Sequence, residues 1–289
     1  MSSLSLVPQN HRDFKVGSLH LDIISVGGYY TCIQLPREKI AIDMGVCSQK
    51  AISANRVFFT HPHPDHISAF IQHVSTREMT LSQSNTTYYI EEQHHTYLSS
   101  IINNWRSISR CRLHCTVESI QPKQHIPINK NLHVVPFRSV HRIPCMGYTF
   151  YRSKKRLKPQ YNSCTTAELI ALRKKNISIE DKHNINILSV TGDTTHDVFH
   201  QQPHILKSEV LITEVTFFCD RISPTKAKKM GHMHIEDILL YADDFQNTHI
   251  VIMHLSARYT TQQVESIIKK RLPQHLIDRI VLIPNEMIL

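Results

Sequence analysis

Short apolar runs recur along the chain and are separated by polar or turn-forming residues. Such runs are typical of strands, whereas apolar residues spaced three and four apart predict helices. The predicted strands span residues 19–25, 30–35, 39–42, 56–60, 86–90, 132–136, 148–152, 186–190, 210–214 and 250–254. The predicted helices span residues 67–73, 91–105, 234–244 and 261–270. The pattern therefore predicts a strand-rich α/β protein.

Residues 152–186 interrupt this pattern, because they are mostly polar and rich in Lys and Arg. The basic residues that we single out are Arg152, Lys154, Lys155, Arg156, Lys158, Arg173, Lys174 and Lys175. We interpret the segment as an insertion that projects from a single domain of residues 1–289. The alternative is that these charges form only a solvated face, as most charge runs do.

The amino-acid composition is that of a globular protein. The 289 residues include 33 Lys and Arg against 24 Asp and Glu, a formal net charge of +9, and 41% are hydrophobic. This balance excludes a disordered polyelectrolyte, and no apolar run approaches the roughly 18 residues of a membrane span. The seven cysteines are scattered, and the first residues lack a signal-peptide layout. A cytoplasmic protein with reduced thiols and no membrane partner is expected.

The densest cluster of potential metal ligands directly follows a predicted strand. It reads His61-Pro-His63-Pro-Asp65-His66, with three imidazoles and one carboxylate in six residues. The two prolines favour an extended backbone, so His61, His63 and Asp65 are expected to share one side. Zn²⁺ accepts this set of nitrogen and oxygen ligands. The alternative is a histidine-rich surface loop, because the chain holds 21 histidines.

The cluster matches the His-x-His-x-Asp-His signature of the metallo-β-lactamase superfamily, and the chain resembles that superfamily in further motifs. These motifs lie at residues 42–45, 137–148, 191–195 and 253–259. Thr213-Glu214-Val-Thr-Phe and Gly231-His232-Met-His234 make the chain similar to the tRNase Z family, in particular to its short, plant-like forms. The resemblance implies an αββα sandwich with a basic insertion, or arm, after the third metal motif.

The resemblance also implies two Zn²⁺ ions per subunit, with Mn²⁺ or another divalent ion as alternatives. One ion would be held by His61, His63 and His141, and the other by Asp65, His66 and His254. Asp193 would bridge the two ions. Asp43 would support the ligand loop without binding metal.

By the same resemblance, the paired ions would hold a water as hydroxide for attack on a phosphodiester. His232, oriented by Glu214, would protonate the leaving oxygen, and Asp65 is counted with these catalytic groups as well as with the ligands. His234 is the alternative acid, because it lies two residues further along the chain.

The chain departs from the family in three places. Ile67-Ser-Ala-Phe70 replaces a stretch that usually holds two glycines, and neither the Pro-x-Lys-x-Arg-Asn loop nor the Gly-Pro motif of the arm is present. The metal ligands are unaffected. The basic insertion suits RNA, since Lys and Arg contacts to phosphates provide affinity without sequence preference. How tRNA is held is therefore less defined than how phosphate is cut.

The leading hypothesis is a zinc-dependent endoribonuclease that removes the 3′ trailer of precursor tRNA and leaves a 3′-hydroxyl. The first alternative is a binuclear metallohydrolase of the same fold that acts on a small phosphodiester or ester. The second alternative is a non-catalytic RNA-binding relative, which predicts that ligands are missing. The expected partners are precursor tRNA and a second copy in a homodimer, with no DNA.

Overall fold

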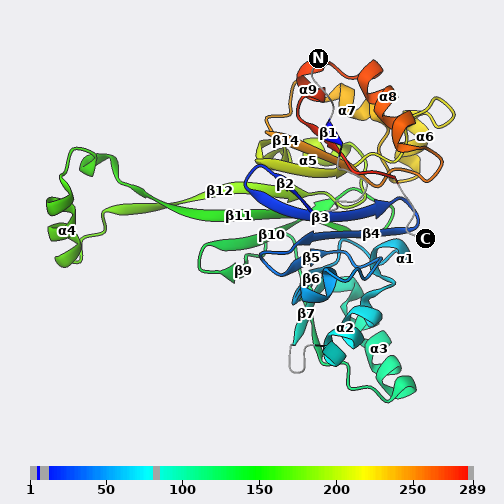
Figure 1. Ribbon diagram of the computed structural model, residues 1–289, viewed down its shortest axis with the longest axis horizontal. Helices are drawn as coiled ribbons and strands as arrows, with labels where there is room; N and C mark the ends of the chain where they lie inside the picture. The colour runs from blue at the N-terminus through cyan, green and yellow to red at the C-terminus, as the bar shows by residue number, and fades with distance from the viewer. Residues whose placement is uncertain (1–4, 7–12, 81–84, 286–289) are drawn as a thin grey trace.

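Two β-sheets form the body of the protein, and the computed structural model describes residues 5–6, 13–80 and 85–285 (Figure 1). The first sheet has the strand order β2-β3-β4-β5-β6-β7-β8. Its strands are β2 (Asp13–Val16), β3 (Leu19–Val26), β4 (Tyr30–Leu35), β5 (Ile40–Ile42), β6 (Arg56–Phe58), β7 (Thr86–Glu91) and β8 (Cys115–Ile120). Strands β2 to β5 pair antiparallel, and β5 to β8 pair parallel.

The second sheet has the strand order β1-β15-β14-β13-β12-β11-β10-β9. Its strands are β1 (Ser5–Leu6), β9 (Ile126–Asn129), β10 (Leu132–Ser139), β11 (Cys145–Leu157), β12 (Glu180–Val190), β13 (Val210–Glu214), β14 (His249–Met253) and β15 (Ile280–Leu282). Strands β12 to β15 are parallel. Their carboxyl ends therefore meet at one edge of the sheet.

The core lies between the two sheets and continues beneath helices on both outer faces. Ile33 and Phe58 of the first sheet share one apolar cluster with Val134, Tyr148 and Val190 of the second. A second cluster joins the second sheet to helices α5 (Asp197–Gln201), α7 (Ile235–Leu240), α8 (Thr261–Arg271) and α9 (Gln274–Ile277). A third joins the first sheet to α2 (Phe70–Thr80) and α3 (Glu92–Ser109). These layers confirm the expected αββα sandwich.

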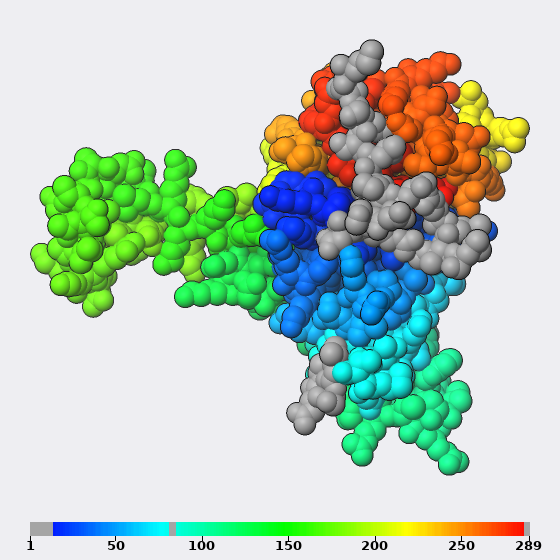
Figure 2. Space-filling view, viewed as in Figure 1, coloured from blue at the N-terminus to red at the C-terminus, as the bar shows by residue number. Residues whose placement is uncertain are grey.

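A long hairpin projects from the second sheet, and we call residues 152–186 the arm (Figures 1 and 2). Strand β11 is buried from Cys145 to Phe150 and increasingly exposed beyond that point. At the tip lies helix α4 (Thr166–Lys174), which begins with a capping box between Thr165 and Glu168 and has no buried residue. Ile179 is the only residue of the arm that is buried, so the pairing of β11 with β12 and local hydrogen bonds, more than apolar packing, hold the arm together.

The observed helices and strands differ from the predicted ones mainly where segments are short or polar. The helix predicted over 67–73 is divided into α1 (Pro64–Ile67) and α2. Strands β8 and β9 lie at sheet edges and bury few side chains, so they lack the apolar run that predicts a strand. The short helix α6 (Pro224–Lys229) is mostly polar. Within the described ranges, no helix is long and apolar enough to cross a membrane.

Candidate metal centre

The predicted ligands come from loops that follow β6, β10, β12 and β14 at a single edge of the molecule. Pro64 occupies the first turn of α1, where its missing N–H leaves no intrahelical bond unmade. The turn brings the ring centroid of His66 to 4.2 Å from that of His61. Backbone hydrogen bonds join Met44, just after β5, to the end of this turn. Gly45 permits the approach, because a Cβ there would overlap the carbonyl of Asp65.

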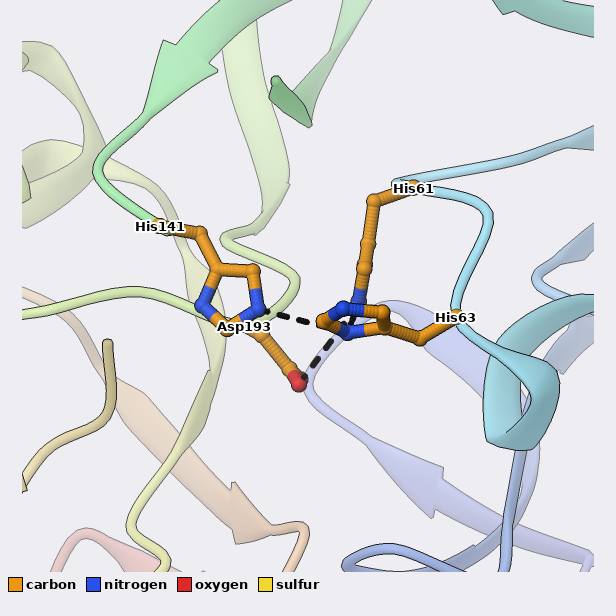
Figure 3. Close-up of side chains that lie close together, drawn as sticks. All are labelled: His61, His63, His141 and Asp193. Carbon is orange, nitrogen blue, oxygen red and sulfur yellow. Dashed lines mark hydrogen bonds and ion pairs between the residues drawn. The ribbon is translucent and has the colours of Figure 1, made fainter. Parts of the chain in front are cut away.

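One group of donors consists of His61, His63, His141 and Asp193 (Figure 3). Nε2 of His61 lies 2.8 Å from Nδ1 of His63, and Nε2 of His141 lies 3.4 Å from the same Nδ1. Oδ2 of Asp193 lies 3.7 Å from Nε2 of His61. The ligand atoms of all four residues lie within 4.8 Å of one another, which is the spacing expected around one cation.

A second group consists of Asp65, His66 and His254. Nε2 of His66 lies 3.6 Å from Oδ2 of Asp65, and Nε2 of His254 lies 3.4 Å from it. The same two nitrogens lie 3.4 and 3.5 Å from Oδ1 of Asp193. The carboxylate of Asp193 therefore faces the first group with one oxygen and the second group with the other.

The donor set fits a pair of divalent cations. Oδ1 of Asp193 is buried and has no hydrogen-bond partner, although several imidazole nitrogens surround it. Burial alone would raise the pKa of Asp193, but His254 and His66 hold it well below its usual range. Burial also lowers the pKa of His61, His63 and His141, which favours the neutral imidazole that binds metal. An ionised, buried carboxylate beside three imidazoles that burial keeps neutral, those of His61, His63 and His141, is typical of a metal site.

His66 has a second carboxylate partner on its other nitrogen. Its Nδ1 lies 2.7 Å from Oδ2 of Asp43, a carboxylate that also accepts the backbone N–H and the hydroxyl of Thr60. Burial opposes a charge on His66, but Asp193 and Asp43 outweigh it and raise the pKa of His66 well above its usual value. Asp43 does not reach the donor atoms of either group. Its contacts are those of a residue that orients a ligand, as the resemblance implies.

Glu214 and His232 lie beside the two groups of donors. Nδ1 of His232 is 2.9 Å from Oε1 of the fully buried Glu214 and 3.9 Å from Oδ2 of Asp193. Burial would lower the pKa of His232, but the Glu214 carboxylate outweighs it and raises this pKa to about 9. His232 is therefore mostly protonated at neutral pH, with its Nε2 not taken up by any of the described residues.

His234, the alternative acid, has a structural place instead. Its Nδ1 accepts the backbone N–H of Glu236 at the start of α7, and its Nε2 lies 3.4 Å from the carbonyl of Cys219. Its side chain contacts none of the donor groups above. The geometry therefore favours His232. Because Asp193, His232 and His254 also lie within ligand distance of one another, the hydrogen bond to Glu214 is what sets His232 apart from the ligands.

Two further residues of the site, Thr60 and Thr216, were not predicted; their hydroxyls bond to ring nitrogens of His61 and His254. Thr60 directly precedes the His-x-His motif. Thr216 lies two residues after Glu214, and alternation in extended backbone puts both on one side. Backbone strain is a further sign of the site, since Asp43 and His254 have φ values of 60° and 59°. No sequence pattern reports these partners directly.

Proteins with similar sequences identify the family to which this site belongs. No protein-family model matches the chain. Over 259 residues the chain is 32% identical to tRNase Z TRZ1 of Arabidopsis thaliana, and the match covers 89% of the chain and 92% of that relative. The chain belongs to the tRNase Z family. Chloroplastic tRNase Z TRZ2 of the same plant is 26% identical over 263 residues, which cover 90% of the chain and 74% of that relative.

Solved structures agree with this family at the level of fold. The metallo-β-lactamase fold protein YhfI from Bacillus subtilis matches with a TM-score of 0.58 at 15% identity, over 92% of this chain and 95% of that one. Human tRNase Z, short form (ELAC1), matches with a TM-score of 0.57 at 19% identity, over 82% and 93%. The family, the enzyme class and the metallo-β-lactamase fold expected from the motifs are therefore confirmed.

The eight basic residues that the sequence singled out lie on the arm of this tRNase Z family member (Figure 1). Four of them contact carboxylates: Arg152 lies near Glu38, Lys155 and Arg173 near Glu180, and Lys158 near Asp181. The other four, Lys154, Arg156, Lys174 and Lys175, have no carboxylate within ion-pair distance among the described residues. The arm thus keeps an excess of positive charge away from the site.

Proposed function

We propose that the protein is a metal-dependent endoribonuclease that removes the 3′ trailer from precursor tRNA. The observation that carries this proposal is the buried Glu214–His232 pair beside the shared carboxylate of Asp193, because it adds a protonated acid to a phosphate-binding metal centre. The metal centre alone would suit many hydrolases of this fold. The names of the relatives, which are tRNase Z and ribonuclease Z, support RNA as the substrate.

We propose that zinc occupies the centre, because imidazole and carboxylate oxygen are ligands that zinc prefers. His61, His63 and His141 would hold one ion, Asp65, His66 and His254 the other, and Asp193 both. Two such ions would supply an activated water and neutralise charge that builds on the phosphoryl oxygens. The His254 side chain lowers the pKa of Asp65 despite its burial, so Asp65 stays ionised, as both roles assigned to it require.

A side chain of the protein supplies the proton that the leaving group needs. Attack by water on phosphorus breaks the bond to the 3′ oxygen, and that oxygen needs a proton to leave as a hydroxyl. His232 carries a proton near neutral pH, and Glu214 fixes its ring through Nδ1, so Nε2 is the nitrogen that donates. The products are a 3′-hydroxyl on the tRNA and a 5′-phosphate on the trailer.

We propose that the arm binds the body of the tRNA. Its exposed lysines and arginines would neutralise phosphates, and counterion release makes such contacts favourable at low salt. The arm is the outer part of the β11–β12 hairpin, and at the inner end of this hairpin His141 lies in the loop before β11 and Asp193 in the loop after β12 (Figure 1). The arm therefore has a fixed direction relative to the centre. A long reach suits a substrate that is recognised by shape.

A homodimer remains part of the proposal. Helix α3 presents Tyr97, Ile101, Trp105 and Ile108 on one face, with exposed fractions of 71%, 46%, 47% and 78%. In a twofold dimer the same stripe is presented by both copies, so it would be buried against itself. Light scattering after size exclusion tests this, since Trp105→Glu should convert a dimer to a monomer while leaving the fold intact.

Cleavage of precursor tRNA tests the function directly. Zinc-loaded protein is incubated with a precursor that carries a 3′ trailer, beside a chelated sample and an assay of bis(p-nitrophenyl) phosphate. Chelator-sensitive cutting at the trailer junction is expected. Hydrolysis of the small diester with an intact precursor would instead favour the alternative, a metallohydrolase that acts on small phosphodiesters.

A further inference from the structure

Two buried threonines connect carboxylates to histidines of the centre. The hydroxyl of Thr60 lies 2.8 Å from Oδ2 of Asp43 and 3.0 Å from Nδ1 of His61. The hydroxyl of Thr216 lies 2.5 Å from Oε2 of Glu214 and 3.1 Å from Nδ1 of His254. The two threonines follow different strands, β6 and β13, and each serves one of the two donor groups.

The direction of each hydrogen bond follows from a count of protons. A hydroxyl has one proton to donate, and a carboxylate can only accept. Each threonine therefore donates to its carboxylate, and its oxygen can only accept from the imidazole. His61 and His254 must then carry a proton on Nδ1, and in the neutral ring this leaves the lone pair on Nε2. Nε2 is the atom of each ring that faces Asp193.

The other two histidines that offer Nε2 reach an acceptor directly. Nδ1 of His66 lies 2.7 Å from Asp43, and Nδ1 of His141 lies 2.8 Å from the carbonyl of Gly231. Nδ1 of His61 has no carboxylate or carbonyl oxygen as a partner among the described residues. Apart from Thr60, its neighbour is the thiol sulfur of Cys145 at 3.8 Å, which is a weak acceptor. Without the hydroxyl of Thr60, the buried Nδ1–H of His61 would lack a good partner.

We infer that Thr60 and Thr216 are positioning residues that fix the tautomers of His61 and His254, one in each half of the metal centre. Each hydroxyl passes the acceptor character of a carboxylate on to a histidine that the carboxylate does not reach. Glu214 thereby serves two histidines, with Oε1 on His232 and Oε2 on Thr216. This inference rests on the proposed metal centre, but its test does not depend on RNA.

Paired substitutions separate the hydroxyl from the packing of the side chain. Thr60→Val and Thr216→Val keep the size and the branched shape but remove the hydroxyl, whereas Thr60→Ser and Thr216→Ser keep the hydroxyl. Shape matters at Thr60, since its side chain packs against Gly192, where an added Cβ would lie 2.8 Å from Cβ of Thr60. A role in packing predicts that Ser is worse than Val, and a role in positioning predicts the reverse.

Zinc binding is the first measurement. Competition with a chromophoric chelator should show that each Val variant holds one of its two zinc ions roughly 10- to 100-fold more weakly, as loss of a ligand's hydrogen-bond partner typically does. Each Ser variant should stay within a few-fold of the wild type. Val variants that bind both ions as tightly as the wild type, or Ser variants as weak as Val, would overturn the inference.

The protonated nitrogen of each ring is the second measurement, and it needs no metal. Long-range ¹⁵N–¹H spectra of the metal-free protein should show Nδ1–H for His61 and His254 in the wild type and in the Ser variants. The Val variant should shift the affected ring toward Nε2–H. An unchanged tautomer in both Val variants would refute the inference. A wild type that binds no divalent ion would refute the proposed metal centre, and the spectra would still decide the role of the threonines.

Discussion

The metal centre and the arm are built in opposite ways. At the centre, His61 and Asp193 are 0% and 1% exposed, and short loops from several strands bring each side chain to specific partners. On the arm, helix α4 buries no residue, and lysines and arginines meet carboxylates only at the surface, as Lys155 meets Glu180. The function of the metal centre therefore depends on the positions of single atoms, whereas that of the arm depends on the sum of many charges.

The contrast predicts different responses to substitution. Removing one member of a buried charged network leaves other groups unpaired and has a large effect, whereas an exposed ion pair contributes about 0 to 1 kcal/mol. Chemistry should therefore be abolished by one change at the centre. Binding of RNA should decline gradually as arm charges are removed.

Asp193→Ala is expected to have the largest effect, because this carboxylate faces both donor groups. Metal should no longer bind, and cleavage of precursor tRNA and of the small diester should both fall by on the order of 10³-fold or more. Metal analysis and both rate assays check this. A variant that keeps two ions and normal rates would contradict the assignment of the shared carboxylate.

His232→Ala should retain metal and still lose most RNA cleavage, by roughly 10²- to 10⁴-fold, since the leaving oxygen no longer receives a proton. Hydrolysis of bis(p-nitrophenyl) phosphate should fall much less, because nitrophenolate leaves without a proton. Comparing the two substrates therefore tests the role of His232 as an acid. Equal losses on both would instead place His232 in metal binding.

Buried histidines of the body should also make stability depend on pH. His73 is fully buried, its Nε2 lies 3.0 Å from the carbonyl of Ala51 and its Nδ1 lies 2.7 Å from the hydroxyl of Tyr88. Burial lowers the pKa of His73 to about 4 from 6.5. The unfolded chain then takes up a proton that the folded chain does not, so stability is full above pH 6.5 and is lost as pH falls toward 4.

This loss should amount to on the order of 3 kcal/mol of unfolding free energy. Denaturant unfolding between pH 7 and 4 measures it in the wild type and in His73→Gln, which has no titrating ring. The variant should be less stable at pH 7 and show a smaller pH dependence. An identical pH dependence in both proteins would show that His73 does not titrate as described.

Removing arm charges should have the mildest effect. Replacing Lys154, Lys155 and Arg156 by Gln should raise the KM for precursor tRNA roughly tenfold, and the slope of log affinity against log salt should fall by about 0.7 for each phosphate that is no longer neutralised. Rates on the small diester should not change. The control variant replaces Lys269 and Lys270 on α8, away from the arm. An equal decrease on both substrates would contradict the proposed role of the arm.

The sequence was most informative where chemistry follows an apolar strand. Strand β13 has the predicted bounds, and β6 and β14 lie within two residues of theirs, so His61, Glu214 and His254 could be placed at strand ends in advance. Order along the chain and motif spacing then identified the family. These features are local, and so a single sequence reports them.

Contacts between distant residues were not predictable in this way. Thr60 meets Asp43 and Thr216 meets His254 only because two loops converge, 17 and 38 residues apart in sequence. The strands within the arm were also not predictable, since β11 and β12 continue for several residues as polar, exposed strands that carry no apolar signal. Tertiary pairing, and not local preference, extends these strands.

The chemistry of the cut ends tests the central claim most directly. Zinc-loaded protein is incubated with precursor tRNA, and both products are examined for their terminal groups. Attack by water with His232 as acid predicts a 3′-hydroxyl on the tRNA and a 5′-phosphate on the trailer. A 2′,3′-cyclic phosphate with a 5′-hydroxyl trailer would mean that the RNA's own 2′-hydroxyl attacks, which would contradict the account.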